Sequence, residues 1–398
     1  MRILIVEDDL DSRLLLKHTL ENWGHDIIAS EDGAEAWQIL YREPISFVIT
    51  DWMMPEMDGL ELCRRIRAAD FKHYVYIILL TAKNDKKELV AGMEAGADDF
   101  VVKPFNKGEL NVRIRAGERI LKLEKDLDER NQKLSEAYSD IKKDLEAAAK
   151  VQESLLPDST SMIHGVKFEW LFMPCTFVAG DIFSFFPVDE KVLGFYHLDV
   201  AGHGVPAAML SVTLSKMLSQ TSLKESFVKK PLPVAPFYKI LTPPEVVYDL
   251  NERFQNEDDN NMQYFTMVYG LIDVINKKLR FTQAGHPTPM LLKQNEEIQL
   301  IGNGGVPVGM LPGMEYEECE YDFQNGDRLF IYSDGITECT NREQEQFSEN
   351  RLIYHIDKYR DLPLRESLNK LKDSLRLWRG SDEYEDDVSI LALEGVEL

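Results

Sequence analysis

The sequence predicts two folded domains of different class, a doubly wound α/β domain and a layered α+β domain, joined by a long helix. Three observations carry this prediction. Short apolar runs alternate with amphipathic segments over residues 1–117, which is typical of a parallel sheet covered by helices on both faces. Charged residues dominate 118–157, where neither glycine nor proline occurs before Pro157. Over 158–398, many short alternating segments and a few helical ones predict an α+β domain with mostly antiparallel strands.

The composition is that of a folded protein and argues against several classes of partner. The chain has 398 residues, 44% of them hydrophobic and 29% charged, which is enough for two or three domains with cores of their own. Its formal net charge of −24, from 69 acidic and 45 basic residues, disfavours binding to nucleic acid and to membrane surfaces. The lack of a basic recognition helix also excludes a transcription factor.

The cysteines and the apolar segments predict a cytoplasmic protein. The four cysteines are scattered without a CxxC spacing, which favours reduced thiols over a disulfide framework or a zinc site. No apolar run is long enough to cross a bilayer. The run at residues 3–6 is too short for the core of a signal peptide and is followed at once by acidic residues.

Polar residues follow the expected strands of the first domain. The carboxyl ends of parallel strands meet at one edge of the sheet, where ligands bind. The strands are predicted from β-branched apolar runs at 3–6, 47–50, 75–80 and 100–102. The side chains that follow the runs are Glu7, Asp8, Asp9, Asp51, Thr81 and Lys103.

These residue types suit the transfer of a phosphoryl group onto a carboxylate. Three carboxylates form a hard oxygen site that suits Mg²⁺. A lysine can pair with the incoming phosphoryl group, and a threonine hydroxyl can donate a hydrogen bond to it. Ordinary acidic caps and turns are the alternative interpretation. Four strand-end matches in the right order argue against such a coincidence.

Residues 1–117 resemble the receiver domains of bacterial response regulators, which have a flavodoxin-like fold. By this resemblance Asp51 is the phosphoacceptor. Glu7 and Asp8 would hold Mg²⁺, with Asp51 and the carbonyl of Met53 completing the site. The implied phosphoryl donor is a histidine kinase.

The same resemblance implies a switch at this edge of the sheet. Thr81 and Phe100 would be the switch pair, whose hydroxyl and ring reposition on phosphorylation. Lys103 would contact the phosphoryl group, and the Lys103–Pro104 peptide is expected to be cis. Glu7 stands where many relatives have aspartate and keeps the negative charge.

Residues 118–157 are predicted to form a helical linker with an imperfect coiled-coil seam. The helix would be roughly 55 Å long at about 1.5 Å per residue. A parallel homodimer through this linker is predicted, and a single solvated helix on a neighbouring domain is the open alternative. Asn131 and Asp144 interrupt the seam. The residues that recur at every seventh position are Leu127, Leu134, Ile141, Ala148 and Leu155.

The last part of the chain, 158–398, is predicted to fold as a domain of its own. A proline-rich stretch at 231–244 is interpreted as a surface loop. Helices are expected near 206–220, 243–256 and 364–378. Strands are expected at 166–172, 192–198, 263–273, 278–284, 328–333 and 388–393.

Aspartates recur in this domain at strand ends or beside glycine. Hydrolysis of a phosphomonoester benefits from two divalent cations about 3.5–4 Å apart, which share a water and bind the phosphoryl oxygens. Such a pair needs carboxylates from several strands, because one strand cannot surround two ions. Taken singly, each motif is more often a turn than a ligand. The ordered set is more specific, and its members are Asp181, Asp199, Asp334, Asp386 and Asp387.

Residues from about 150 to 398 resemble the bacterial PPM-type, SpoIIE-like phosphatases that regulate sporulation and sigma factors. The matching motifs, in family order, are VQESLLP, AGD, DVAGHGVPAAML, AGHP, GGVPVG, YSDGITE and DDVSILAL. The resemblance implies a central β-sandwich flanked by helices, with two Mn²⁺ or Mg²⁺ ions at one end.

The resemblance also implies a role for each matching aspartate. Asp199 would bridge the two metals, with the carbonyl of Val200 as a further ligand. Asp181 would bind a metal or orient a metal-bound water, while Asp334 and Asp386 would coordinate from distant strands.

Asp387 stands where the fold often has asparagine. Ser184 and Ala201 depart from the family pattern but remove no ligand carboxylate, so an active enzyme is expected. His203 is interpreted either as a general acid or as a residue that only shapes its GHG turn, and His286 as structural.

Together these features predict a response regulator in which phosphorylation controls a metal-dependent protein serine/threonine phosphatase. The implied substrate is a phosphorylated, STAS-type antagonist of an anti-sigma factor, supplied by another chain. The alternative is a non-catalytic adaptor that binds a sigma-factor regulator when the receiver is phosphorylated. Retention of the metal-site aspartates argues against an adaptor, which has no chemical need for them.

Overall fold

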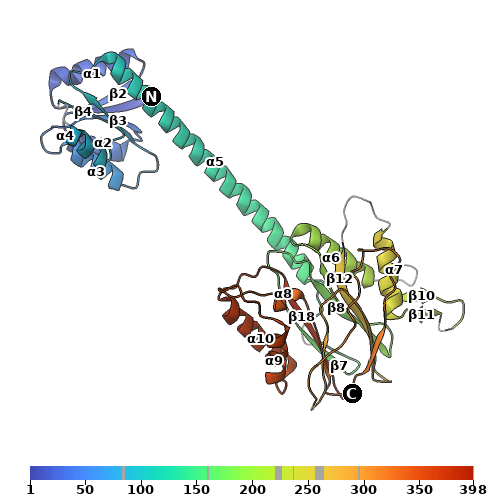
Figure 1. Cartoon of the computed structure of the whole chain (residues 1–398). Helices are drawn as coiled ribbons and strands as arrows, with labels where there is room; N and C mark the ends of the chain where they lie inside the picture. The colour runs from blue at the N-terminus through green and yellow to red at the C-terminus, as the bar shows by residue number, and fades with distance from the viewer. Residues whose placement is uncertain are drawn as a thin grey trace. The chain divides into compact units, whose positions relative to one another are not determined.

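The computed structural model describes residues 1–82, 86–158, 161–219, 226–235, 237–255, 264–294 and 296–397. The chain divides into two compact units, Met1–Asp140 and Ile141–Leu398 (Figure 1). None of the helices in the described ranges combines the length and the apolar character that crossing a bilayer requires. The domain boundaries after residues 117 and 157 stay predictions, because the division of the chain falls inside a helix.

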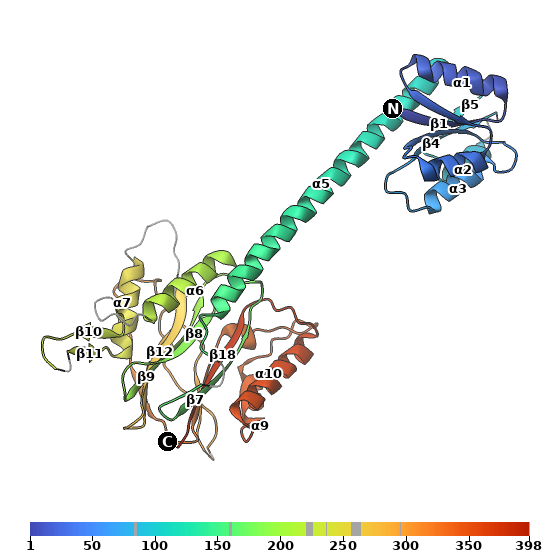
Figure 2. The same cartoon turned by 180° about the vertical axis from the view of Figure 1, so that it is seen from behind.

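The first unit is a five-stranded parallel sheet with the strand order β2-β1-β3-β4-β5, as predicted. One apolar core lies between the sheet and helices α1 and α5, and a second lies between the sheet and helices α2 and α3 (Figure 2). The strands are β1 (Arg2–Val6), β2 (Asp26–Ser30), β3 (Phe47–Asp51), β4 (Tyr76–Thr81) and β5 (Asp99–Val102). The helices are α1 (Leu10–Asn22), α2 (Gly33–Arg42), α3 (Gly59–Ala68), α4 (Lys86–Glu94) and α5 (Lys107–Glu153).

Aspartate caps start three of these helices. Asp9, Asp32 and Asp58 each accept a hydrogen bond from a backbone N–H of the first helical turn, which would otherwise lack a partner. Strand β2 was not among the predicted apolar runs. It is an edge strand with only one buried residue, Ser30, so its sequence lacks the continuous apolar signal of the central strands.

Helix α5 is longer than the predicted linker and starts earlier. It has 47 residues, and its first turns belong to the first unit, where Leu110 and Ile114 are fully buried. The helix ends before Pro157, which cannot continue a helix. Its seam residues Leu127, Leu134 and Ile141 are 53%, 69% and 60% exposed. The apolar stripe therefore has no cover within the described part of this chain.

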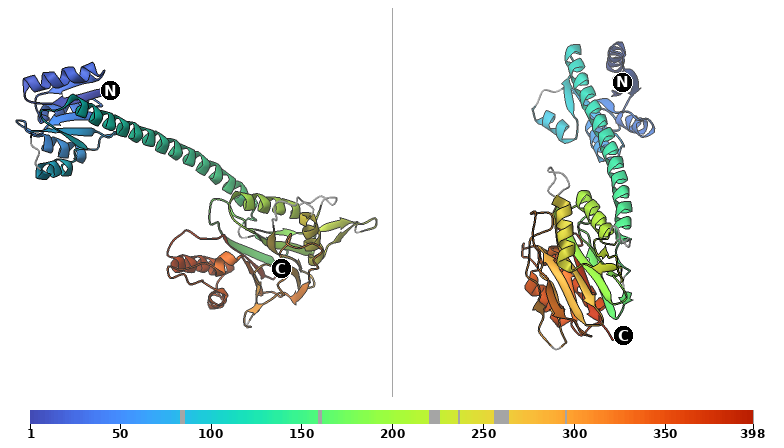
Figure 3. Two further views of the ribbon diagram at one scale, coloured as in Figure 1. Left: turned by 45° about the horizontal axis from the view of Figure 1, so that its top comes forward. Right: turned by 90° about the vertical axis from the view of Figure 1, so that its right-hand side faces the viewer.

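The second unit is a sandwich of two antiparallel sheets, with an apolar core between them. Helices α6 and α7 pack on the five-stranded sheet, and helix α10 packs on the six-stranded sheet (Figure 3). The five-stranded sheet contains, in order, β16 (Cys319–Asp322), β13 (Lys278–Ala284), β12 (Phe265–Asp273), β9 (Val192–Val200) and β8 (Ile182–Pro187).

The six-stranded sheet contains, in order, β15 (Gln299–Leu300), β14 (Met290–Leu292), β17 (Arg328–Tyr332), β18 (Val388–Gly395), β7 (Val166–Met173) and β6 (Ser161–Ile163). The helices of this unit are α6 (Val205–Leu218), α7 (Pro243–Gln255), α8 (Asp334–Thr337), α9 (Glu349–Lys358) and α10 (Leu364–Arg379). The predicted layered α+β domain with a central sandwich is confirmed.

The proline-rich stretch 231–244 is not the plain loop that was predicted. Strands β10 (Lys229–Pro231) and β11 (Tyr238–Ile240) pair as an antiparallel hairpin, and α7 starts at Pro243. Proline is tolerated at a strand end and in the first turn of a helix, because its missing N–H is not needed there. The predicted helix ends at 220 and 256 and the strand start at 263 lie outside the described residues.

Candidate functional site

Three carboxylates of the first unit meet at the carboxyl ends of strands β1 and β3. Oxygen atoms of Glu7, Asp8 and Asp51 lie within 4.8 Å of one another. The Lys103 ammonium lies 2.6 Å from Glu7 Oε2 and 3.0 Å from Asp51 Oδ1. Burial raises the pKa of Glu7 above its ordinary value, even though Lys103 opposes the shift. One ammonium against three carboxylates leaves negative charge that suits a hard divalent cation such as Mg²⁺.

The other residues singled out in the first unit lie on neighbouring elements. Thr81 is buried at the end of β4, and its carbonyl accepts a hydrogen bond of 2.7 Å from the Lys103 N–H. Phe100 lies on β5 with the Arg113 guanidinium 5.7 Å from its ring centroid. Met53 has an exposed side chain, and the prediction concerns its carbonyl. The Lys103–Pro104 peptide is cis.

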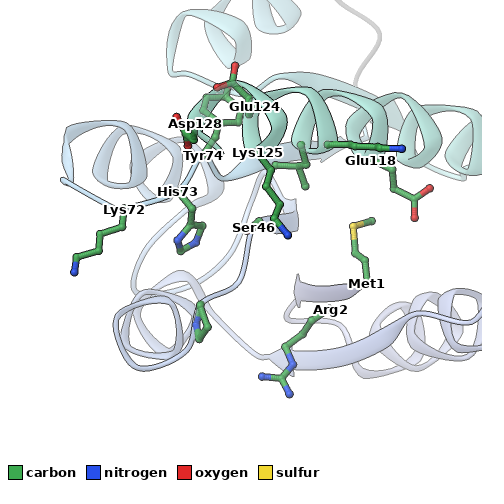
Figure 4. Close-up of a pocket in the computed structure, with 13 residues that line it drawn as sticks. Met1, Arg2, Ser46, Lys72, His73, Tyr74, Glu118, Glu124, Lys125 and Asp128 are labelled. Carbon is green, nitrogen blue, oxygen red and sulfur yellow. The ribbon is translucent and has the colours of Figure 1, made fainter. Parts of the chain in front are cut away.

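A separate groove of about 690 Å³ lies at the opposite edge of this sheet (Figure 4). Arg2, Ser46 and Tyr74, at the amino ends of three strands, face Glu118 and Lys125 of α5 across it. Both signs of charge line the groove. The groove has no part in the carboxylate chemistry at the other edge.

The second unit has a pocket of about 270 Å³ where several strand ends meet. Three of the predicted aspartates line it: Asp199 near the end of β9, Asp334 at the start of α8, and Asp386 just before β18. The structure thus brings together carboxylates from distant parts of the chain. The complete lining is Asp199, Val200, Ala201, Gly202, His203, Tyr264, Thr266, Asp334, Glu385 and Asp386.

Asp181 lies directly behind this lining and is only 1% exposed. Asp199 is close enough for its charge to act on the Asp181 carboxyl group. Burial, followed by the charges of Asp199 and Asp387, raises the pKa of Asp181 well above its ordinary value. The four aspartates predicted from the sequence therefore form one cluster.

The cluster carries negative charge that the described residues do not neutralise. Burial and the charges of Asp334 and Asp386 raise the pKa of Asp199 to about 8. Burial and the charge of Asp386 raise the pKa of Asp334 to about 6. Within the described ranges, none of the four aspartates has an ion pair with lysine or arginine. Carboxylates that line one pocket without a cation fit a site for Mn²⁺ or Mg²⁺.

The metal-free protein is expected to be more stable near pH 6 than near pH 8. An aspartate of the unfolded chain ionises near pH 3.9, whereas the folded pKa of Asp199 is about 8. Because the folded pKa is raised, the protonated form favours folding, and this stabilisation is lost as the pH rises through the folded pKa. Thermal unfolding of chelator-treated protein at the two pH values would test this. Asp199→Asn should weaken the dependence, and an equally strong dependence in the variant would contradict this assignment.

Asp387 has a structural task that the sequence pattern did not reveal. It is buried, and it accepts hydrogen bonds from the backbone N–H groups of Cys175 at 2.8 Å and Gly180 at 2.7 Å. These bonds hold the loop that leads into Asp181. Gly335 lies so close to this segment that an added Cβ would be 2.1 Å from the Asp387 carbonyl oxygen. The glycine after Asp334 is therefore required by a close contact.

The two histidines differ in environment. His203 is exposed at the pocket, and its charge lowers the pKa of Asp386, whose overall shift is upward because of burial. Both interpretations of His203 remain open. His286 is buried, its Nδ1 lies 2.7 Å from Thr266 Oγ1, and burial lowers its pKa to about 3. A neutral, buried ring supports a structural role for His286.

Gln152 was not singled out by the sequence, although it lies in the VQESLLP motif. It is only 3% exposed, and its amide makes two reciprocal bonds to the backbone of Ala179. The Ala179 N–H donates to Gln152 Oε1 at 2.9 Å, and Gln152 Nε2 donates to the Ala179 carbonyl at 2.7 Å. Nε2 also lies 3.1 Å from Ser211 Oγ on α6. An almost fully buried glutamine near the end of α5, beside the exposed Val151, connects this helix to the Asp181 loop.

Comparison with known proteins finds a separate family match for each half of the chain. Residues 189–395 match the family model described as stage II sporulation protein E (SpoIIE), and residues 3–115 match the response regulator receiver domain. A chemotaxis protein CheY homolog from Campylobacter jejuni is 38% identical over 116 residues, which cover 29% of this chain and 89% of that protein.

Other relatives and solved structures agree with this division. The regulatory protein PhoP of Bacillus subtilis is 38% identical over 115 residues, covering 29% of this chain and 47% of its own length. The solved SiaA-PP2C domain of Pseudomonas aeruginosa superposes with a TM-score of 0.55 at 18% identity, covering 65% of this chain and 98% of that domain. This structural match shows a shared fold.

Proposed function

The chain belongs to the stage II sporulation protein E family and carries a response-regulator receiver domain in its N-terminal part, and we propose on this premise that phosphorylation of Asp51 controls a metal-dependent protein serine/threonine phosphatase. The observation that carries the proposal is the cluster of Asp181, Asp199, Asp334 and Asp386 around one pocket without a neutralising cation among the described residues. A binding module has no need for such a costly arrangement of like charges.

Each residue of the pocket then has a task. Two Mn²⁺ or Mg²⁺ ions, when bound, would lower the pKa of a shared water and neutralise the phosphoryl oxygens. Asp199 and the Val200 carbonyl would hold both ions, and Asp334 and Asp386 would complete the ligand set. Asp181 would orient the metal-bound water from behind Asp199. His203, exposed at the pocket beside Asp386, would hold the proton for the leaving serine or threonine oxygen, or would shape the loop.

The receiver site would accept a phosphoryl group from a histidine kinase. Asp51 would be the acceptor, and Glu7, Asp8 and the Met53 carbonyl would hold Mg²⁺. The position of Lys103 Nζ, 3.0 Å from Asp51 Oδ1, supports a direct contact with the phosphoryl oxygens. The hydroxyl of Thr81 and the ring of Phe100 would then reposition as the switch pair.

The substrate proposed is phosphoserine or phosphothreonine on an STAS-type antagonist of an anti-sigma factor. That protein would come from another chain, and we propose that the encounter takes place in the cytoplasm. The exposed stripe of Leu127, Leu134 and Ile141 supports a parallel homodimer through α5, because pairing would remove these apolar side chains from water.

Control of the phosphatase by the receiver would pass through α5. The segment Val151–Leu156 contains the last residues of the helix and those that follow it. Within it, Gln152 is hydrogen-bonded to the backbone of Ala179, two residues before Asp181. A change in the packing of α5 on phosphorylation would shift these hydrogen bonds and, with them, the Asp181 carboxylate. The proposal holds for either sign of control.

Full-length protein is expected to hydrolyse a phosphorylated antagonist and a generic aryl phosphate only when Mn²⁺ or Mg²⁺ is present. Treatment with acetyl phosphate should change the rate on the antagonist, and Asp51→Asn should remove that change while leaving the basal rate. Phosphate release measured with and without a chelator would test both statements. Equal rates for phosphorylated, unphosphorylated and receiver-deleted protein would exclude control by the receiver. Binding of the antagonist without any hydrolysis would favour the adaptor.

A further inference from the structure

A short chain of hydrogen bonds lies behind Asp181, between the two sheets of the sandwich. Ser389 Oγ on β18 is 2.5 Å from Asp181 Oδ2 and 3.0 Å from His197 Nε2 on β9. Asp181 is 1% exposed, and His197 and Ser389 are fully buried. The chain thus joins both sheets at one carboxylate of the pocket.

The direction of the hydrogen bonds follows from proton counting. Ser389 Oγ donates its single hydroxyl proton to Asp181 Oδ2. Ser389 Oγ can then accept a hydrogen bond from His197 Nε2, which requires the proton of the imidazole to be on Nε2. The ring is fully buried, and a neutral imidazole, which carries one proton, avoids the cost of an unpaired buried charge.

The surroundings of the ring support the same tautomer. His197 Nδ1 is buried and has no hydrogen-bond partner among the described residues. With the proton on Nε2, every N–H and O–H of the chain is paired, and only the Nδ1 lone pair lacks a partner. Phe183 stacks on the His197 ring, with 5.7 Å between the ring centroids and 15° between the ring planes. The centroid of the His286 ring lies 4.8 Å from that of His197. These contacts hold the orientation of the imidazole.

Packing alone does not explain a histidine at this place. The site is fully buried among apolar side chains of the sandwich core, where an imidazole with an unpaired nitrogen is costly and a phenylalanine would not be. The cost of burying this imidazole is understandable if the Nε2–H group serves as a hydrogen-bond donor. Among the described residues, its hydrogen-bond partner is the hydroxyl that donates to Asp181.

We propose that His197 and Ser389 are positioning residues that hold the Asp181 carboxylate toward the metal site through the directed chain His197 Nε2–H to Ser389 Oγ–H to Asp181 Oδ2. This inference rests on the proposed function, in which Asp181 serves that site. Without the chain, the carboxylate loses the hydrogen-bond donor that Ser389 supplies. Residues that orient a metal ligand by hydrogen bonding typically change metal affinity by about 10- to 100-fold.

A double-mutant cycle on the full-length protein separates positioning from packing. The variants are His197→Phe, Ser389→Ala and their combination, and calorimetric titration of chelator-treated protein with Mn²⁺ is the measurement. Each single variant should raise the Mn²⁺ dissociation constant about 10-fold. The double variant should be no worse than either, because both remove the same chain. Additive effects, close to about 100-fold together, would overturn the inference.

Two further variants sharpen the test. His197→Gln keeps an N–H donor near the position of Nε2 and should restore the affinity to within about 3-fold of wild type, whereas a packing role predicts no rescue by this less ring-like side chain. His355→Phe is the matched control, because that ring is also buried but lies on α9, where its Nδ1 is 3.3 Å from Ser374 Oγ. It should lower the melting temperature and leave Mn²⁺ affinity unchanged. An equal loss of affinity in His355→Phe would overturn the inference.

One measurement needs no variant. The ¹⁵N chemical shifts of His197 in the wild-type protein report which ring nitrogen carries the proton, and Nε2 is expected. A proton on Nδ1 would overturn the directed chain. Wild-type protein that binds no Mn²⁺ and hydrolyses no phosphate would overturn the proposed function and this inference together. Binding and hydrolysis by wild type with an additive cycle would overturn the inference alone.

Discussion

Asp199→Asn is expected to abolish phosphatase activity, with a loss of at least roughly 100- to 1,000-fold in kcat on any phosphomonoester substrate. Asp199 lies where the other carboxylates of the pocket converge, and its pKa is about 8 because of burial, Asp334 and Asp386. Asparagine keeps the shape of the side chain but removes the negative charge that a bridging ligand supplies. Rates with saturating Mn²⁺ and calorimetric Mn²⁺ titration would measure the loss.

The same substitution should not unfold the protein. Removing one of several crowded like charges relieves repulsion, so metal-free Asp199→Asn should melt at or above the wild-type temperature near pH 8. Asp322→Asn is the matched control, because Asp322 is exposed on β16 and pairs with Lys278. It should keep full activity. Activity above about a tenth of wild type in Asp199→Asn, with unchanged Mn²⁺ affinity, would rule out the proposed bridging role.

Gln152→Ala is expected to uncouple the receiver from the phosphatase. The substitution removes both bonds to the Ala179 backbone and leaves buried polar groups unpaired, which should cost about 1–3 kcal/mol of stability. The ratio of rates with and without phosphorylation of Asp51 should fall to about one, whichever state is the more active in wild type. Rates on a phosphorylated antagonist, before and after acetyl phosphate, give this ratio.

Gln132→Ala is the matched control for this experiment. Gln132 lies on the same helix, but it is exposed and bonds only within the helix to Glu136 at 3.0 Å. The control should keep the full response to phosphorylation. A Gln152→Ala variant with an undiminished response would show that control does not pass through this contact.

Much of the fold could be predicted because the strongest local signals coincide with burial. The central strands β1, β3 and β4 are buried on both faces, so they appear in the sequence as continuous apolar runs. Edge strands such as β2 and β15 have little burial and gave no such signal. The start of α5 was missed for a different reason, since Leu110 and Ile114 are core residues and look like any amphipathic helix.

The residues of the candidate site likewise divide into those with a local sequence signal and those without one. Asp199, Asp334 and Asp386 could be singled out because each follows or precedes a strand beside a recognisable motif, and the structure brings them to one pocket. The contacts behind them are tertiary and have no local pattern. Gln152 and Ser389 meet their partners only through folding. A weak signal existed for His197, because it shares a strand face with Asp199, two residues on.

The close packing of Gly335 against the Asp387 backbone limits which substitutions this pocket can tolerate. Ser333 Oγ donates to the Asp387 carbonyl at 3.0 Å and accepts from the Ser389 N–H at 3.0 Å, so the Ser333 side chain ties the segment before Gly335 to the backbone of residues 387–389. Side chains around the rim of the pocket can be substituted while these two hydrogen bonds of Ser333 stay intact. Even a methyl group at position 335 would force the two segments apart. Variation around the rim of the pocket is therefore compatible with the position of Asp334 and Asp386, whereas a side chain at position 335 is not.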